Sequence, residues 1–173
     1  MSRLRPEQIT AASAFAEATL AALPSADAVT RISACARMAG SFLFRNFAHA
    51  LNRPAPGSVL SLPVAGERGP RLIGLLQSAL ARLGLAVDAG RAELEHDSLA
   101  TPALGFLASQ AQLEPAFAAI RQQQGLSLEE AADAAAVAVA MLIKQGERAL
   151  PAQAAFAVAV YAFIEGSKTV PAS

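Results

Sequence analysis

The residues best placed for chemistry lie in the segment 66–71, where two arginines flank the start of a predicted helix. Free backbone amides at a helix N-terminus attract anions, and the guanidinium groups of Arg68 and Arg71 would add positive charge there. The segment lacks the Lys-Ser or Lys-Thr pair of a phosphate-binding loop, and Pro70 removes one amide donor. Arg68 and Arg71 are therefore candidate ligand-binding residues for an anion, and a turn with two solvated arginines is the alternative.

A second set of polar side chains recurs at every fourth position of the preceding predicted helix: Arg37, Ser41, Arg45, His49 and Arg53. This spacing places them on one helix face, which could meet phosphate groups. The formal net charge is zero and we find no helix-turn-helix pattern, so we predict no nucleic-acid partner and favour a solvated face or ion pairing within the chain. Arg45 and His49 join the two arginines above as candidate ligand-binding residues.

Metal-ligating and nucleophilic residues are few. Glu93 and His96 match one Glu-x-x-His unit of a di-iron bundle, but such a site needs a second unit on a facing helix, and the chain has none. Cys35 falls on the apolar side of its predicted helix, which is typical of a small core residue. We assign no catalytic residue, no metal and no cofactor, and we favour a protein that is not an enzyme.

Composition bounds the class of protein. Of the 173 residues, 54% are hydrophobic and 16% are charged, which fits a single domain with a substantial core. No apolar stretch reaches the roughly 20 residues that a membrane span requires. The N-terminal segment has no apolar region of the kind that marks a secretory signal. A single cysteine excludes an internal disulfide, and we expect a cytoplasmic protein.

The elements that must position these residues are helices. Helical spacing of apolar residues predicts helices over 6–22, 27–51, 70–83, 102–124, 128–145 and 151–165, with a marginal seventh over 91–96. Pro115 is expected to kink or break the fourth, and Ser127 with Glu130 forms a capping box that starts the fifth. The Pro- and Gly-rich residues 52–70 predict an irregular loop. The expected fold is all-α, a compact bundle of six or seven helices in one domain spanning 1–173.

The two C-terminal helices are apolar on every side. Residues 131–143 carry Asp133 as their only charge, and residues 152–164 carry none. Because such helices must be covered all round and a short link joins them, they predict an antiparallel hairpin. The hairpin is the central layer of the bundle, an oligomer interface, or the lining of an apolar pocket. As an interface it would use Val137, Met141, Phe156, Val160 and Phe163. Glu165, at its end, is expected to be exposed and to pair with Lys168.

Two functions follow from these patterns. The first is a non-enzymatic helical interaction protein that associates with itself or with an unknown protein through apolar helix faces. Its basis is the excess of apolar helix surface over the chain available to cover it. The alternative is a protein, possibly an enzyme, that binds a small molecule or an anion at the 52–71 loop and the start of the third helix.

Overall fold

The computed structural model describes residues 3–47, 54–60, 64–92 and 101–172, and within 64–68 it describes the backbone only. The described part is all-helical, as predicted. Its α-helices are α1 (Pro6–Ala22), α2 (Ala28–Phe47), α3 (Val64–Arg82), α4 (Phe106–Gln123), α5 (Leu128–Gln145) and α6 (Ala152–Lys168), with a short 3-10 helix at Ala89–Arg91.

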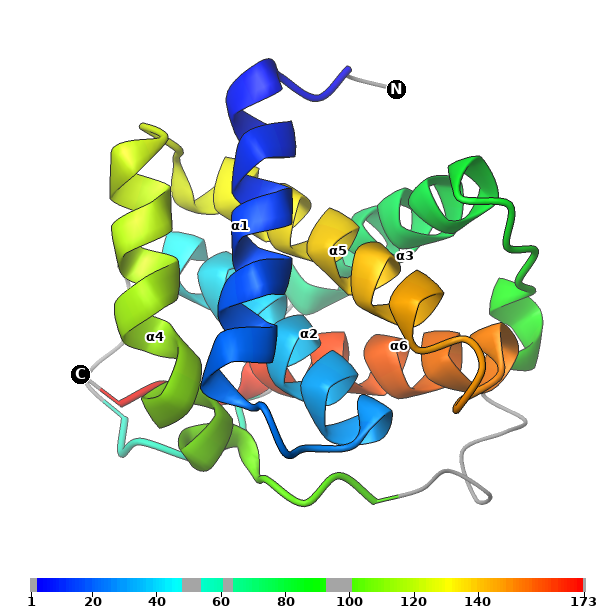
Figure 1. Ribbon diagram of the computed structural model, residues 1–173. Helices are drawn as coiled ribbons and strands as arrows, with labels where there is room; N and C mark the ends of the chain where they lie inside the picture. Colours follow the sequence, from blue (N-terminus) through cyan, green and yellow to red (C-terminus); the bar gives the residue numbers. More distant parts are fainter. Residues whose placement is uncertain (1–2, 48–53, 61–63, 93–100, 173) are drawn as a thin grey trace.

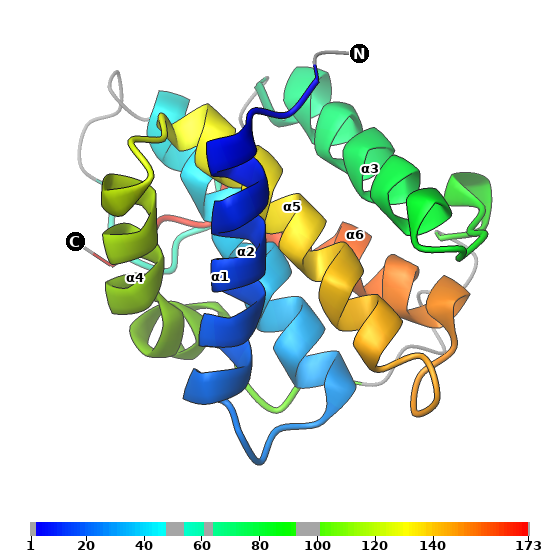
Figure 2. The same cartoon turned by 45° about the horizontal axis from the view of Figure 1, so that its top comes forward.

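Helix α2 is the centre of the bundle. It packs most extensively on α6 and α5. Helix α1 lies across α5, and α4 lies beside α1; α3 packs on α5 and α6 on the side of the bundle opposite α4 (Figures 1 and 2). The rings of Phe15, Phe42 and Phe117 join α1, α2 and α4, with the closest pair of centroids, Phe15 and Phe117, 4.4 Å apart. Stacked aromatic rings of this kind add to the stabilisation that their burial supplies.

The predicted antiparallel hairpin of α5 and α6 is not confirmed, because the two helices contact each other far less than each contacts α2. Small residues explain the preference for α2. A Cβ at Gly40 would lie 2.4 Å from the carbonyl oxygen of Phe163, and one at Gly166 would lie 2.2 Å from the carbonyl oxygen of Arg37. These two glycines let the backbones of α2 and α6 touch.

Helix α6 runs to Lys168, past the predicted end at 165, and two further predictions, which involve prolines, were wrong. Helix α3 begins at Val64, so it includes the end of the predicted 52–70 loop and has Pro70 inside it. Helix α4 begins at Phe106 and runs through Pro115 without a break. A proline inside a helix removes one hydrogen bond and disfavours the preceding residue, and here packing on neighbouring helices outweighs that local cost.

The predicted bounds of α1 are confirmed. At the start of α2, Asp27 accepts a hydrogen bond from the Thr30 amide at 2.8 Å. Part of the predicted loop, 54–60, is tied to the C-terminal end of α6 through an isolated antiparallel bridge between Val59 and Thr169. Residues 48–53, 61–63 and 93–100 lie outside the description, so the predicted helix end near 51 and the helix over 91–96 are described only in part.

Among the helices of the described ranges, none is both long enough and apolar enough to cross a membrane.

Candidate ligand-binding site

Two of the four candidate ligand-binding residues, Arg45 and Arg71, have described side chains, and these lie in different places. Arg45 forms a bidentate ion pair with Glu114 of α4, with Nη2 3.0 Å from Oε2. Arg71 lines a hollow. His49 and the side chain of Arg68 lie outside the described residues.

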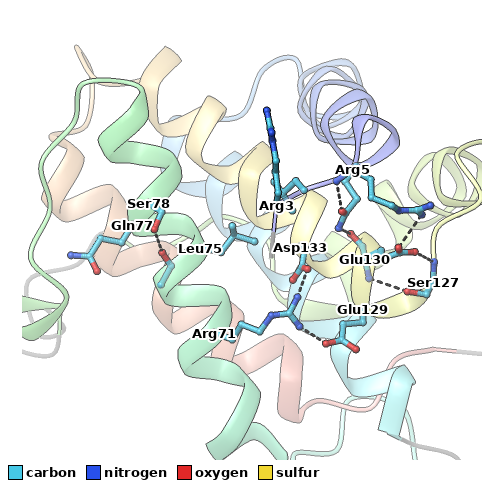
Figure 3. A pocket seen from close by; sticks show the side chains of 13 residues that line it. Arg3, Arg5, Arg71, Leu75, Gln77, Ser78, Ser127, Glu129, Glu130 and Asp133 are labelled. Atoms are coloured by element: carbon cyan, nitrogen blue, oxygen red, sulfur yellow. Dashed lines mark hydrogen bonds and ion pairs between the residues drawn. The ribbon is translucent and has the colours of Figure 1, made fainter. Parts of the chain in front are cut away.

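This hollow has a volume of about 840 Å³ and lies between the start of α1, one side of α3 and the first turns of α5 (Figure 3). Its lining residues are Arg3, Leu4, Arg5, Gln8, Arg71, Gly74, Leu75, Gln77, Ser78, Ser127, Glu129, Glu130 and Asp133. The size falls in the range of small-molecule sites, which are concave and carry a few fixed polar groups. We refer to it below as the α1/α3/α5 hollow.

Arg71, which lines the hollow, joins α3 to α5. One terminal nitrogen of its guanidinium pairs with Glu129, and the other pairs with Oδ2 of Asp133 (Figure 3). The arginine side chain is 44% exposed, whereas that of Asp133 is only 7% exposed. The planar guanidinium of Arg71 therefore binds two carboxylates of α5 at once, and it lies on the solvent side of Asp133.

The start of α1 is joined to the start of α5 by a second group of polar contacts. Arg5 pairs with Oε1 of Glu130 at 2.9 Å, while Oε2 of the same carboxylate accepts the Ser127 amide at 2.9 Å. The Ser127 hydroxyl accepts the Glu130 amide at 3.1 Å, so the predicted capping box is confirmed. The hydrogen bond from the Ser127 amide, aided by Arg5, lowers the pKa of Glu130 and keeps this carboxylate ionised.

Asp133 is the least satisfied polar group in the hollow. Its Oδ1 is buried and has no hydrogen-bond partner among the described residues. Burial raises the pKa of Asp133 to about 6; Arg71 opposes the rise, and the negative charges of Glu129 and Glu130 add to it. The nearby amide of Gln8 lowers the pKa slightly, but it donates to the Glu130 carbonyl at 3.3 Å and makes no hydrogen bond with Oδ1.

The charges of the hollow do not cancel locally. Three carboxylates, those of Glu129, Glu130 and Asp133, meet two arginines, Arg5 and Arg71, in ion pairs. Arg3 also lines the hollow, but its guanidinium points away from Asp133 in Figure 3. The inner part of the hollow therefore has an excess of negative charge, which adds to the rise in the pKa of Asp133 that burial causes.

Other chemically interesting residues are used inside the fold. Cys35 is fully buried, and burial raises the pKa of its thiol to about 12, as expected of a core cysteine rather than a nucleophile. The described residues contain no group of three or more His, Cys, Asp or Glu side chains able to hold a metal ion. The predicted Glu93 and His96 pair lies outside the described residues.

The five candidate interface residues lie within or against the core. Phe156, Val160 and Phe163 of α6 are buried, and Val137 and Met141 of α5 are half-buried and packed on the core. Glu165 was expected to be exposed and to pair with Lys168; it is half-buried, and its ion-pair partner is Arg37.

Sequence reasoning did not assign a role to Asp133, Glu129 or Gln8. The signal that could have found Asp133 is its position as the only charge in an otherwise apolar helix segment, because a charge on a covered helix face must have a partner or a function. Its partner Arg71 is 62 positions away in the chain, so no local pattern connects them.

Comparison of the chain with protein-family models, with curated proteins and with solved structures finds no match.

Proposed function

We propose that this protein binds a small polar molecule in the α1/α3/α5 hollow. The observation that carries the proposal is the buried carboxylate of Asp133, which lines the hollow and has one oxygen without a partner among the described residues. A buried polar atom left without a hydrogen bond costs about 1–3 kcal/mol, and a bound donor would recover that cost. Arg71 was also part of the ligand site expected from the sequence. The proposed site differs from that expectation because it lies between α1, α3 and α5 and not at the 52–71 loop.

The burial of α5 and α6 reduces the argument for self-association. That argument depended on apolar helix surface exceeding the chain available to cover it, yet the alanines of α5 from Ala131 to Ala140 are covered by the chain's own helices. In the described part of the chain, the large hydrophobic side chains that remain exposed are dispersed over several elements: Ile9, Val59, Leu83, Leu107 and Ile164. Single exposed apolar residues of this kind are usual for a protein surface.

Backbone amide spectra recorded during a screen of small polar compounds would test the proposal. Binding in the hollow should shift the amide signals of Gly74, Ser78 and Asp133 more than those of residues on α4. Gly74→Met should abolish these shifts, because a Cβ at Gly74 meets nothing within 4 Å and the methionine would enter the open space of the hollow.

Ala81→Met is the matched control, since Ala81 is exposed on the same helix and does not line the hollow. This variant should keep both the fold and the ligand-dependent shifts. Binding that survives Gly74→Met unchanged, or a screen in which no compound shifts these three amides, would reject the proposal.

Self-association is a second candidate, favoured by an apolar groove of about 570 Å³ between α3 and α6. The groove is lined by Val160, one of the predicted interface residues, together with Ile73, Tyr161 and Ile164, the last being 38% exposed. A second copy of the chain is the proposed occupant of the groove. Because the formal net charge is zero, two copies do not repel each other through their overall charge. Native mass spectrometry over a range of concentrations should then show a dimer that Ile164→Lys weakens; a monomer at all concentrations would reject it.

A further inference from the structure

The inner part of the α1/α3/α5 hollow is built to receive positive charge. The carboxylates of Glu129, Glu130 and Asp133 lie on the first turns of α5. Two arginines, Arg5 and Arg71, pair with these three carboxylates, so one negative charge is not balanced by an ion pair. The excess charge falls on Asp133, the most buried of the three side chains. A cation that entered here would meet an attraction strengthened by the low polarity around Asp133.

One hydrogen-bond acceptor among the same residues, Oδ1 of Asp133, has no donor in the described part of the chain. Arg71 directs its two terminal nitrogens to Glu129 and to Oδ2 of Asp133, which leaves Oδ1 of Asp133 without a partner in the described part of the chain. Rotation about the Cβ–Cγ bond of an aspartate is a soft motion, so the enclosed Oδ1 can turn toward a ligand, and the contact of Arg71 with Oδ2 would shift with it. An ammonium group brings up to three donors to such a site.

An anion is disfavoured at the same place. Two amides near the start of α5, which would otherwise attract one, are engaged by the capping box: the Ser127 hydroxyl accepts the Glu130 amide, and the Glu130 carboxylate accepts the Ser127 amide. Arg5 and Arg71 are each paired with carboxylates of the chain. An incoming anion would have to displace these groups and would be repelled by the remaining carboxylate.

From these observations we infer that the ligand of the hollow carries a protonated amine, and that this group binds at Asp133 beside Arg71. The inference rests on the proposed function and adds the chemical class of the ligand to it. Leu4 and Leu75, which also line the hollow, contact the hydrocarbon part of the ligand, and Ser78 of α3 offers a hydroxyl to its far end.

Three probes of equal carbon length separate charge from size. We would titrate the full chain with 1,4-diaminobutane, 1,4-butanediol and succinate, and follow the amides of Gly74, Ser78 and Asp133. The diamine should bind, and the diol and the dianion should bind at least about tenfold more weakly, because loss of a charge-assisted hydrogen bond costs about that factor or more.

Asp133→Asn keeps the shape of the side chain and removes its charge. It should weaken binding of the diamine by at least about tenfold, while Glu147→Gln should leave the binding unchanged. Glu147 is a suitable control because its carboxylate pairs with Lys144 near the other end of α5 and does not line the hollow. Amide spectra of both variants would establish that the fold is kept.

The pH profile of binding gives a readout that does not depend on a variant. The charged groups that line the hollow with Asp133 are Arg71 from α3, Arg3 and Arg5 from the segment at the start of α1, and Glu129 and Glu130 on its own helix. Since the pKa of Asp133 is raised to about 6 and the amine stays protonated, affinity for the diamine should increase as the pH rises through that value.

The outcomes distinguish the two proposals. Succinate or the diol binding better than the diamine would overturn the amine inference and leave the hollow as a binding site. Diamine binding that is unchanged in Asp133→Asn, or unchanged across this pH range, would overturn the inference as well. If none of the three probes and no compound of the broader screen shifts the three amides, the inference and the proposed function fail together.

Discussion

Two ion pairs in this bundle, Arg37 with Glu165 and Arg71 with Asp133, each have one buried member, and the buried member differs in charge. In the first, the cation is inside: the Arg37 side chain is 8% exposed and Glu165 is 40% exposed. In the second, the anion is inside and Arg71 lies at the surface. A buried arginine and a buried aspartate place different demands on their surroundings, because the first must find acceptors and the second must find donors.

The Arg37 pair meets these demands and the Asp133 pair does not. Nε of Arg37 donates to Glu165 at 2.8 Å, and one of its terminal nitrogens donates to the Leu104 carbonyl at 2.5 Å and to the Ser109 hydroxyl at 3.1 Å. Asp133 has one oxygen without a partner and borders an open hollow. The comparison indicates that Arg37 joins α2, α4 and α6 as a structural element, whereas Asp133 is held ready for a ligand.

The largest effect should come from the crossing of α2 and α6 that supports the Arg37 pair. Gly166→Ala would place a Cβ 2.2 Å from the Arg37 carbonyl oxygen, and because the contact is with backbone, the two helices must separate. We expect a loss of at least about 3–4 kcal/mol in the free energy of unfolding, measured by urea denaturation. A loss below about 1 kcal/mol would show that the helices separate without cost.

Removing the two arginines should have unequal consequences. Arg37→Met leaves the Leu104 carbonyl and the Ser109 hydroxyl without their buried donor, and should cost about 3 kcal/mol. Arg71→Met should cost only about 1 kcal/mol near pH 7, because Asp133 can take up a proton once its counter-charge is gone. Urea denaturation of both variants checks this, and equal losses would remove the distinction between the two pairs.

Asp133→Asn should remove a pH dependence that the buried carboxyl imposes on stability. The pKa of this group is raised from its ordinary value of 3.8 to about 6, so the folded chain binds the proton more tightly than the unfolded chain. The resulting stabilisation is fully present below the unfolded pKa and is lost as the pH rises through about 6, by up to about 3 kcal/mol.

The measurement is the free energy of unfolding of both proteins from about pH 4 to about pH 7. The parent protein should lose stability relative to Asp133→Asn across this interval. Glu130 and Asp27, whose pKa values are lowered, act in the opposite direction. Asp27 is present in both proteins and cancels in the difference, whereas Glu130 interacts with Asp133 and changes with it. A difference that stays constant with pH would mean that Asp133 does not titrate in this range.

The smallest effect should come from a glycine that borders the hollow. Gly74→Ala adds a methyl group that meets nothing within 4 Å, so it should stabilise α3 by about 0.5–1 kcal/mol through helix propensity alone. The same substitution is therefore expected to stabilise at 74 and to destabilise at 166. Destabilisation at 74, measured by thermal unfolding, would indicate that this side of α3 is packed and that the hollow is filled.

Much of the fold follows from local properties that the sequence carries. The all-α class, the bounds of α1 and the capping box of Ser127 and Glu130 were predicted, since apolar spacing and capping hydrogen bonds involve residues within one or two helical turns. The burial of Cys35 followed from its place on an apolar helix face in the same way. The same reasoning failed at Pro70 and Pro115, because it counts the local cost of proline and not the packing that offsets it.

The site was decided by the tertiary structure. The sequence shows that Asp133 is an isolated charge, but only the approach of α3 to α5 determines that Arg71 is its partner, and only the start of α1 brings Arg5 and Gln8 to the same hollow. The approach of helices depends on which small faces fit together, as Gly40 and Gly166 do between α2 and α6. That fit is a property of surfaces assembled from distant parts of the chain, and the spacing of residues along one helix does not contain it.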